Sequence, residues 1–556
     1  MKKSSIISAI LATVMMMEAG ALQAENVLAQ SLNNQGRNAE SKFLILGGEL
    51  SNSAATSVED IDEVLPRMKA LGLNTVLVPV YWELMEPREG QMDFTLVDRM
   101  IDVARQQELK IVPLWFGAWK NSMSCYAPAW FKRDVKRFPR AVTAEGKPLE
   151  IASCFSDNVL QADLKAFSAL MQHIAEKDPQ CEVVIMMQIE NEIGMLESAR
   201  DHSALAEKAY KQPVPPTLLE ALGMKQRGTW AEVFGTDDYA DEKFMAWHYA
   251  CYVEHLAKAA RQIHDMPLYV NAAMNSRGRK PGEYPSAGPL AHLADIWKAG
   301  APSIDLLAPD IYDTGFKSWA SQYAMPLRPQ EDSHVKNRLF IPESRCCENS
   351  GVRALYAFSE HQALGFSPFA IDQASPKETA SVTRSYGLMS QLSQVKPQNS
   401  WGLLFDQEDR ERIIDDEGVV MTCRHFFTLP WDARATDGST WPEGGAILIR
   451  LGKYEYLLAG CGVVVDFKTR TEKNQEQQKK LGEDGFAEAG AAAQSAAAKF
   501  TGSRLGLLSV DEVAIDAQGQ MQYLRRNNGD QSHQGRHARI GVDDWKILHI
   551  RLYEYK

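Results

Sequence analysis

Two glutamates in this 556-residue chain stand where short apolar runs end, and together they could cleave a glycosidic bond. Glu192 follows the run Val183–Ile189, and Glu343 follows the run Leu339–Pro342. Glycoside hydrolysis needs one carboxylic acid that protonates the leaving oxygen and a second carboxylate on the other side of the anomeric carbon. The distance between them, about 5–5.5 Å in retaining and roughly 6.5–9.5 Å in inverting enzymes, is not encoded in the sequence.

The two carboxyl groups would need different pKa values. The acid requires a pKa raised by burial and by a nearby negative charge, whereas the nucleophile must stay ionised with the help of donors such as Tyr312 or Arg345. Glu190 would point to the same side of an extended strand as Glu192, which predicts a supporting role. Asp310 and Asp372 also follow apolar runs, and a structural role is the better interpretation for both.

Further polar and aromatic residues follow the other apolar runs and suit a carbohydrate site. The candidates for substrate binding are Trp82, Trp119, Lys120, Asn191 and Tyr312. For Trp119 and Tyr312, packing at the mouth of a barrel is an equally good interpretation.

Residues 40–395 alternate short apolar runs with longer amphipathic stretches, which is typical of parallel strands with crossover helices. The runs are Phe43–Gly48, Thr75–Tyr81, Lys110–Phe116, Val183–Ile189, Leu268–Ala272, Ile304–Pro309, Leu339–Pro342 and Gly365–Ile371. Eight such units predict a catalytic (β/α)8 TIM barrel, with a doubly wound open sheet as the rival topology. In a barrel, residues from the ends of several strands meet at one mouth, which is where the candidate residues fall.

From residue 400 onward the sequence favours strands separated by Gly, Asp and Pro turns. The expected strands are Trp401–Phe405, Val419–Thr422, Ala446–Leu451, Tyr454–Ala459, Cys461–Phe467 and Trp545–Tyr555. We therefore predict a β-sandwich-like accessory domain over residues 400–556. Within it, residues 471–500 form a low-complexity insertion, and residues 525–540 read as a mildly basic loop.

Residues 1–24 are typical of a signal peptide. Lys2 and Lys3 precede the apolar run Ile6–Met17, which is too short to span a bilayer, and small residues follow up to Ala24. The expected location is therefore an exported one, periplasmic or extracellular. No integral membrane segment is expected in the mature chain.

Composition narrows the classes of partner. With 60 Lys and Arg against 72 Asp and Glu, the net charge is −12, which disfavours nucleic acid as a partner. Eight cysteines are too sparse for a disulfide scaffold, and the sequence offers no metal-ligand cluster, Walker loop or dinucleotide fingerprint. We expect no metal and no cofactor, and a homo-oligomer is compatible with the sequence.

Three segments resemble glycoside hydrolase family 35, the β-galactosidases of the clan A barrels. Met187–Gly194 is very similar to the family signature Q-[IV]-E-N-E-[YF]-G, Trp82–Pro87 is similar to its W-N-x-H-E-P segment, and Ile341–Glu343 resembles its nucleophile strand. The resemblance implies a retaining mechanism with Glu192 as acid/base and Glu343 as nucleophile. It also implies that Asn191 hydrogen-bonds the 2-hydroxyl of the sugar.

The sequence departs from the family pattern at Ile193, where the signature has an aromatic residue, and at Glu83 and Met85, where it has Asn and His. The chain is most similar to a secreted bacterial subgroup with a β-rich C-terminal domain of unknown function. That likeness implies an exo-β-galactosidase acting on oligo- or polysaccharides, with xyloglucan side chains as one candidate substrate. The alternatives are another clan A β-glycosidase, namely a β-glucosidase or an endo-glycanase, and a non-catalytic glycan-binding protein.

Overall fold

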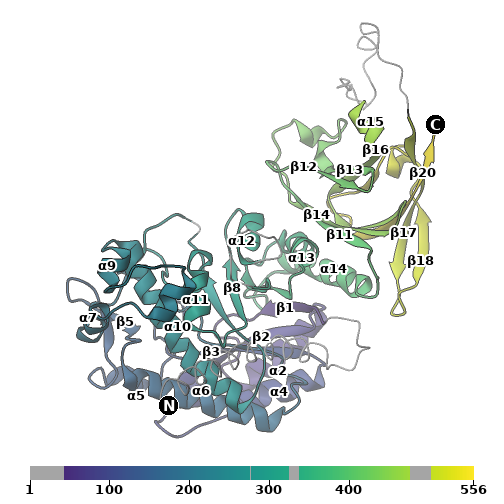
Figure 1. Cartoon of the computed structure of the whole chain (residues 1–556). Helices are drawn as coiled ribbons and strands as arrows, with labels where there is room; N and C mark the ends of the chain where they lie inside the picture. The colour runs from purple at the N-terminus through teal and green to yellow at the C-terminus, as the bar shows by residue number, and fades with distance from the viewer. Residues whose placement is uncertain (1–42, 276, 325–336, 476–501) are drawn as a thin grey trace, which may run out of the picture. The chain divides into compact units, whose positions relative to one another are not determined.

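The computed structural model describes residues 43–275, 277–324, 337–475 and 502–556, which form two compact units (Figure 1). Of the described residues, those up to Cys346 and Ala363–Ala374 belong to the first unit, and Cys347–Gln362 and those from Ser375 onward belong to the second. Two segments before residue 395 thus group with the C-terminal strands, which differs from the boundaries expected from the sequence. The predicted signal peptide and most of the predicted insertion lie outside the described residues.

The first unit is built on parallel strands that close into a barrel in the order β1-β10-β9-β8-β7-β6-β3-β2. This confirms the TIM barrel, and the open sheet is wrong. The strands are β1 (Ile45–Glu49), β2 (Thr75–Tyr81), β3 (Lys110–Phe116), β6 (Met187–Gln188), β7 (Leu268–Ala273), β8 (Leu306–Ile311), β9 (Ile341–Ser344) and β10 (Gly365–Pro368). Each of the eight apolar runs contributes one strand, and β2 and β3 have the expected bounds.

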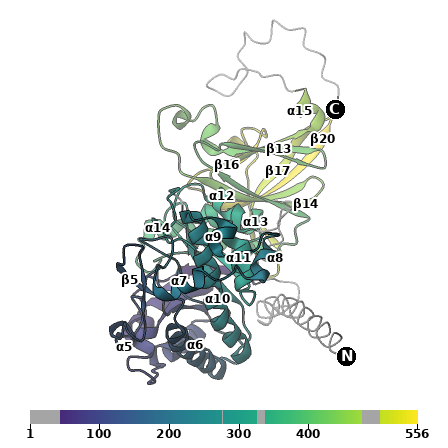
Figure 2. The same ribbon diagram turned by 60° about the vertical axis from the view of Figure 1, so that its left-hand side comes forward.

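Helices of the first unit surround the barrel, and α10 lies beside both α6 and α11 (Figure 2). The elements between the strands are α2 (Val58–Ala70), α3 (Trp82–Met85), α4 (Thr95–Gln106), α5 (Ala129–Arg133), β4 (Arg140–Val142), β5 (Pro148–Ala152), α6 (Asp157–Lys177), α7 (Ala204–Tyr210), α8 (Pro216–Ala221), α9 (Trp230–Phe234), α10 (Asp238–Ile263), η1 (Ala291–Leu293), α11 (Ala294–Gly300) and α12 (Phe316–Tyr323). Among the described residues, no helix is both long and apolar enough to cross a membrane.

Helix α2 shows how the sequence specifies these elements. The Ser57 side chain accepts a hydrogen bond from the amide of Asp60 and caps the first turn. Ile61, Val64, Leu65 and Met68 are buried at three- and four-residue spacing. Just beyond the helix, Gly72 has φ +86°, a conformation that favours glycine.

Within the described residues, the second unit contains two antiparallel sheets and three α-helices, which confirms that the C-terminal region is rich in β-structure. The six-stranded sheet has the order β11-β14-β15-β20-β17-β18, and the four-stranded sheet has the order β12-β13-β16-β19. The elements are α13 (Ser350–Glu360), α14 (Pro376–Leu392), β11 (Asn399–Phe405), β12 (Glu411–Asp416), β13 (Val419–His425), η2 (Phe426–Thr428), η3 (Ala433–Ala435), β14 (Gly444–Gly452), β15 (Glu455–Cys461), β16 (Val463–Thr469), α15 (Arg470–Asn474), β17 (Arg504–Ile515), β18 (Met521–Arg526), η5 (Asp530–Ser532), β19 (Ala538–Ile540) and β20 (Lys546–Tyr555).

Strand alternation divides the six-stranded sheet between two cores. Ile447 and Leu457 pack with Leu355 of α13 and Leu388 of α14 on one face. On the other face the ring of Tyr456 lies 5.6 Å from that of Phe467 in the four-stranded sheet. The sheet is therefore covered by helices on one side and by strands on the other.

Four strands of this unit were not predicted from the sequence. They are β12, β17, β18 and β19, which carry many charged or small residues and few uninterrupted apolar positions. The expected basic loop at residues 525–540 is wrong in part, since Arg525 and Arg526 belong to β18 and Arg539 to β19. These strands are held by pairing with neighbours rather than by their own pattern.

The core beneath α13 and α14 should dominate the stability of the second unit. Leu457 is fully buried there, so Leu457→Ala should lower the free energy of unfolding by about 2–5 kcal/mol. Leu524, which is 56% exposed on β18, is the matched control, and its alanine variant should change stability by less than about 0.5 kcal/mol. Equal shifts of the urea unfolding transition for both variants would contradict this core assignment.

Candidate active site

The two predicted catalytic glutamates meet inside the mouth of the barrel. Glu192 follows β6 and Glu343 lies on β9, and both are buried. One carboxylate oxygen from each of Glu192, Asp310 and Glu343 lies within 4.8 Å of the other two. Strands far apart in sequence therefore deliver three carboxyl groups to one small volume.

Three donors converge on Glu343. The hydroxyl of Tyr312 donates to its Oε2 at 2.6 Å. The amide nitrogens of Asn191 and Asn271 lie 3.3 and 3.4 Å from its Oε1. Donors of this kind stabilise the charged form of a carboxylate, which is what a nucleophile needs. Asn191 and Tyr312 are thus brought to the carboxylates as the sequence predicts, and Asn271 joins them from β7.

Glu192 has the environment of a general acid. Burial, followed by the negative charge of Glu343, raises the pKa of Glu192 to about 7. Its Oε2 accepts a hydrogen bond from the side chain of Asn121, and its amide donates to Oδ1 of Asn271 at 3.0 Å. A carboxyl group with a pKa near neutrality can both give and take a proton at physiological pH.

Two further carboxyl groups in the cluster, those of Asp310 and Glu49, also have raised pKa values. Burial and the charge of Glu343 raise the pKa of Asp310 well above its usual range, and they do the same for Glu49 on β1. The protonated forms of both groups are therefore favoured. A purely structural role was expected for Asp310, but this residue is part of the carboxylate cluster. Its Oδ2 accepts a hydrogen bond from the side-chain amide of Asn271 at 2.8 Å.

Lys120 is the cation of this cluster. It is buried, and its Nζ donates to Oδ1 of Asn191 at 2.9 Å. Because Oδ1 is occupied in this way, the amide nitrogen of Asn191 is turned toward Glu343. The positive charge of Lys120 also acts to lower the pKa values of Glu192 and Glu49.

The loops that carry these side chains pair through their backbones. The amide of Asn121 donates to the carbonyl of Asn191 at 3.1 Å, and that of Ser122 donates to the carbonyl of Glu192 at 3.1 Å. All of Asn121, Ser122, Glu190 and Glu192 have left-handed φ values between 46° and 67°. Non-glycine residues in this region carry strain, which is often found at functional sites.

This turn overturns the extended geometry expected for Glu190. Its carboxylate accepts from the amide of Trp119 at 2.7 Å, behind the loop that carries Lys120. Burial and the charge of Asp163 raise the pKa of Glu190, and burial also raises the pKa of Asp163, so the pair shares a proton. Only glycine fits at position 117, where a Cβ would lie 2.8 Å from Oε1 of Glu190. Glu190 thus supports the loop that carries Trp119 and Lys120, and its side chain does not point to the same side as that of Glu192.

Trp82 and Trp119 are not brought to the carboxylates. The ring of Trp82 lies 5.1 Å from that of Phe131, and its indole donates to Glu86 at 2.8 Å. The ring of Trp119 lies 4.8 Å from that of Tyr252 on α10. Both indoles are fully buried, so packing accounts for them better than contact with substrate does.

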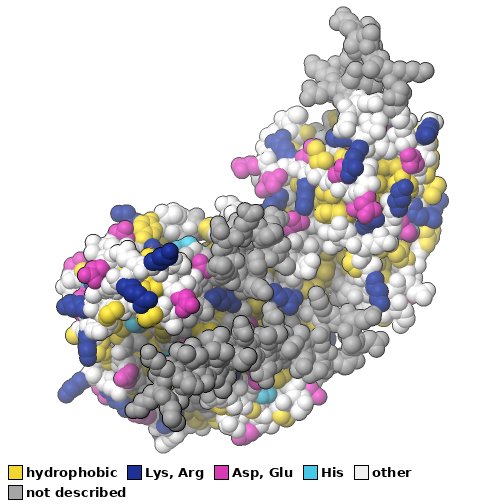
Figure 3. Space-filling view, in the orientation of Figure 1, with side chains coloured by type: hydrophobic (Ala, Val, Ile, Leu, Met, Phe, Trp, Pro, Cys, Tyr) yellow, Lys and Arg dark blue, Asp and Glu magenta, His cyan; other side chains and the backbone are white. Residues whose placement is uncertain are grey.

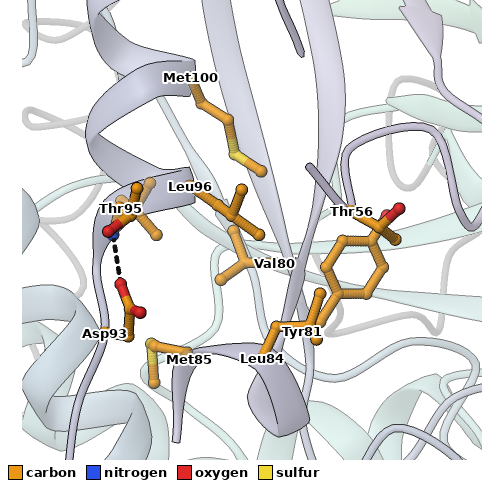
Figure 4. A pocket seen from close by; sticks show the side chains of 10 residues that line it. Thr56, Val80, Tyr81, Leu84, Met85, Asp93, Thr95, Leu96 and Met100 are labelled. Atoms are coloured by element: carbon orange, nitrogen blue, oxygen red, sulfur yellow. Dashed lines mark hydrogen bonds between the residues drawn. The ribbon is translucent and has the colours of Figure 1, made fainter. Parts of the chain in front are cut away.

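A pocket of about 140 Å³ opens next to the acid. It is lined by Glu192, Ala273, Met274, Asp310, Ile311, Tyr312, Asp313 and Trp319. A larger pocket of about 270 Å³ lies between β2, α3 and α4 (Figure 4). Its one carboxylate, Asp93, accepts from the amide of Thr95 at 2.9 Å, so it lacks the pair that hydrolysis needs.

The raised pKa of Glu192 predicts how the activity depends on pH. Since the acid must be protonated, kcat/KM on an aryl β-galactoside should fall as the pH rises through about 7. Lys120→Met removes a charge that lowers this pKa, so the alkaline limb should move to higher pH, whereas Lys120→Arg should leave it near that of the wild type. A shift of the limb to lower pH in Lys120→Met would contradict the assignment.

Comparisons with known proteins find two family models and several β-galactosidases that are similar to parts of the chain. Residues 53–267 match the family model Glyco_hydro_42, described as β-galactosidase, and residues 382–539 match a domain of unknown function, DUF5597. A β-galactosidase of Thermus thermophilus is 24% identical over 48% of this chain and 40% of that protein. One of Xanthomonas manihotis is 30% identical over 26% of this chain and 22% of that protein. The chain thus spans less than half the length of either relative.

Solved β-galactosidase structures also align with the chain. The protein of the psychrophilic Marinomonas ef1 gives a TM-score of 0.42 at 14% identity, covering 62% of this chain and 60% of that one. The Halorubrum lacusprofundi protein gives 0.43 at 16% identity, covering 62% and 58%. The sequence matches support the β-galactosidase resemblance but not family 35 specifically. Residues 53–267 are thus similar to a β-galactosidase family of glycoside hydrolases, that of the Glyco_hydro_42 model.

Proposed function

We propose that the chain is an exported, retaining exo-β-galactosidase that removes terminal β-galactosyl residues from oligo- or polysaccharides. One observation carries the proposal: a carboxylate oxygen of Glu192 lies within 4.8 Å of one of Glu343, and both residues are buried at the barrel mouth. This spacing favours a retaining enzyme, in which the carboxyl groups lie about 5–5.5 Å apart, over an inverting one, in which they lie roughly 6.5–9.5 Å apart.

The reaction proceeds by double displacement. In the first step Glu343 forms a bond to the anomeric carbon, the glycosidic bond breaks, and Glu192 gives its proton to the leaving oxygen. In the second step Glu192 takes a proton from water, and the water oxygen displaces Glu343 from the anomeric carbon. Once Glu343 is esterified, its charge no longer raises the pKa of Glu192, which favours the base form that the second step needs.

The neighbours of Glu343 prepare it for attack. Tyr312 and Asn271 hold the carboxylate from two sides, while Lys120 orients Asn191 so that its amide nitrogen faces the same carboxylate. In this position Asn191 can also donate to the sugar 2-hydroxyl, the contact that the family resemblance implies. The residues therefore act together on the −1 sugar.

A carbohydrate is a better partner for this surface than nucleic acid. On the face seen in Figure 3, basic and acidic side chains are interspersed over both units, and the net charge is −12. Export is supported by the two lysines and the apolar run of residues 6–17. Xyloglucan side chains are one candidate source of the galactosyl residues.

A β-glucosidase or an endo-glycanase would use the same two glutamates. A panel of aryl β-glycosides separates these activities, because the galactoside should be turned over with the highest kcat/KM. Preference for the glucoside would refute the galactose specificity. No turnover of any glycoside would leave a glycan-binding protein as the better account.

Removal of the nucleophile gives a specific test. Glu343→Ala should abolish turnover, and added azide should restore part of it by attacking the vacant face of the anomeric carbon. The product, identified by NMR, should be the glycosyl azide of inverted configuration. A glycosyl azide of retained configuration would contradict the role of Glu343.

Removal of the acid should depend on the leaving group. Glu192→Ala should retain activity on substrates with excellent leaving groups, such as dinitrophenolate, because those need little protonation. For alkyl leaving groups kcat/KM should fall by about 10²–10⁴-fold. If Glu192→Ala matched the wild type on poor leaving groups, the acid assignment would be wrong.

A further inference from the structure

The 140 Å³ pocket beside Glu192 contains only one of the two catalytic glutamates. Glu192 lines it, but Glu343 does not. In a retaining glycosidase the acid contacts the oxygen that joins the cleaved sugar to the leaving group, whereas the nucleophile lies beneath the cleaved sugar. A pocket that touches the acid and not the nucleophile therefore extends toward the leaving group.

Trp319 is the large aromatic residue of this pocket. It lies on α12, and its indole N–H donates to the carbonyl of Thr314 at 3.2 Å. Gly315 begins the helix with φ +84°, and a Cβ there would lie 3.7 Å from the indole nitrogen. The polar edge of the indole is thus held by the turn after β8, which leaves its apolar body to line the pocket.

The charges of the pocket limit what it can bind. Glu192, Asp310 and Asp313 supply its ionisable groups, and no Lys or Arg is among its lining residues. A uronate or a sulfated sugar would find no cation among the lining residues to pair with its negative charge, so burying that charge here would cost binding energy. At about 140 Å³ the pocket is also smaller than the roughly 300–1,000 Å³ typical of sites for drug-sized ligands, which suits a single ring.

We propose that Trp319 forms the subsite for the leaving-group sugar, and that this subsite takes one neutral pyranose whose C–H face packs against the indole. The inference rests on the proposed function and adds to it the class of aglycone. Met274, at the end of β7, completes the apolar lining. Substrates whose penultimate sugar is neutral are then preferred over those with an acidic sugar in that position.

Two substrates with the same galactosyl group test this subsite. A β-linked galactosyl disaccharide fills it, whereas β-galactosyl fluoride leaves it empty because fluoride is its leaving group. Trp319→Ala should lower kcat/KM for the disaccharide by about 10- to 100-fold and change that for the fluoride by less than about twofold. Trp319→Phe should recover part of the loss. Equal losses on both substrates, or no loss on either, would overturn the proposal.

A matched control guards against damage to the helix. Ser318 is an exposed neighbour of Trp319 on α12, and Ser318→Ala should behave as the wild type on both substrates. A disaccharide with a uronate at the reducing end should be a poorer substrate for the wild type than its neutral counterpart. If the wild type preferred the uronate, the neutral-sugar assignment would be wrong.

Binding separates failure of this inference from failure of the proposed function. If the wild type cleaves neither substrate, the proposed function fails, and saturation-transfer NMR with the disaccharide then tests the subsite alone. Saturation of the reducing-end ring that disappears in Trp319→Ala would support the subsite. Saturation that persists in the variant, or no binding to the wild type, would refute it.

Discussion

The structure depends on holding several carboxyl groups together in a buried space. Glu49, Glu192, Asp310 and Glu343 interact through their charges at the barrel mouth, and each is at most 6% exposed. Four buried negative charges at such distances would repel one another strongly. Protons held by some of these groups and the positive charge of Lys120 relieve the repulsion. The chemistry follows from this arrangement, because burial and the charge of Glu343 together raise the pKa of Glu192 to about 7.

The backbone around the carboxylate cluster adopts unusual conformations that place the side chains together. The segments after β3 and β6 place Asn121 and Glu192 in left-handed conformations, which cost about 1–3 kcal/mol each for residues other than glycine. Hydrogen bonds between the two segments and the buried Glu190–Asp163 pair hold this geometry. The strained backbone at Glu192 is thus held by residues that do not line the pocket.

Much of the barrel could be predicted from the sequence. The strands β2 and β3 are uninterrupted apolar runs buried on both faces, so their bounds could be read directly.

Glu192, Glu343, Asn191 and Tyr312 were found because they follow such runs or match a motif. Glu49 and Asn271 were missed, although each is a lone polar residue in or just after an apolar run, and such a residue needs a buried partner. Trp82 and Trp119 show the converse error, since an aromatic residue near a strand end serves packing as well as binding. The strands β17 and β18 depend on long-range pairing, which local pattern does not reveal.

We propose that Glu343 is the one group that becomes covalently attached to the sugar, while the neighbouring carboxyl groups form no bond to it. Labelling with a 2-deoxy-2-fluoro-β-galactosyl fluoride, which accumulates the covalent intermediate, followed by peptide mass spectrometry, tests this most directly. The account predicts a single fluorogalactosyl group on the peptide that contains Glu343. A label on Glu49 or Asp310, or rapid turnover without any label, would contradict it.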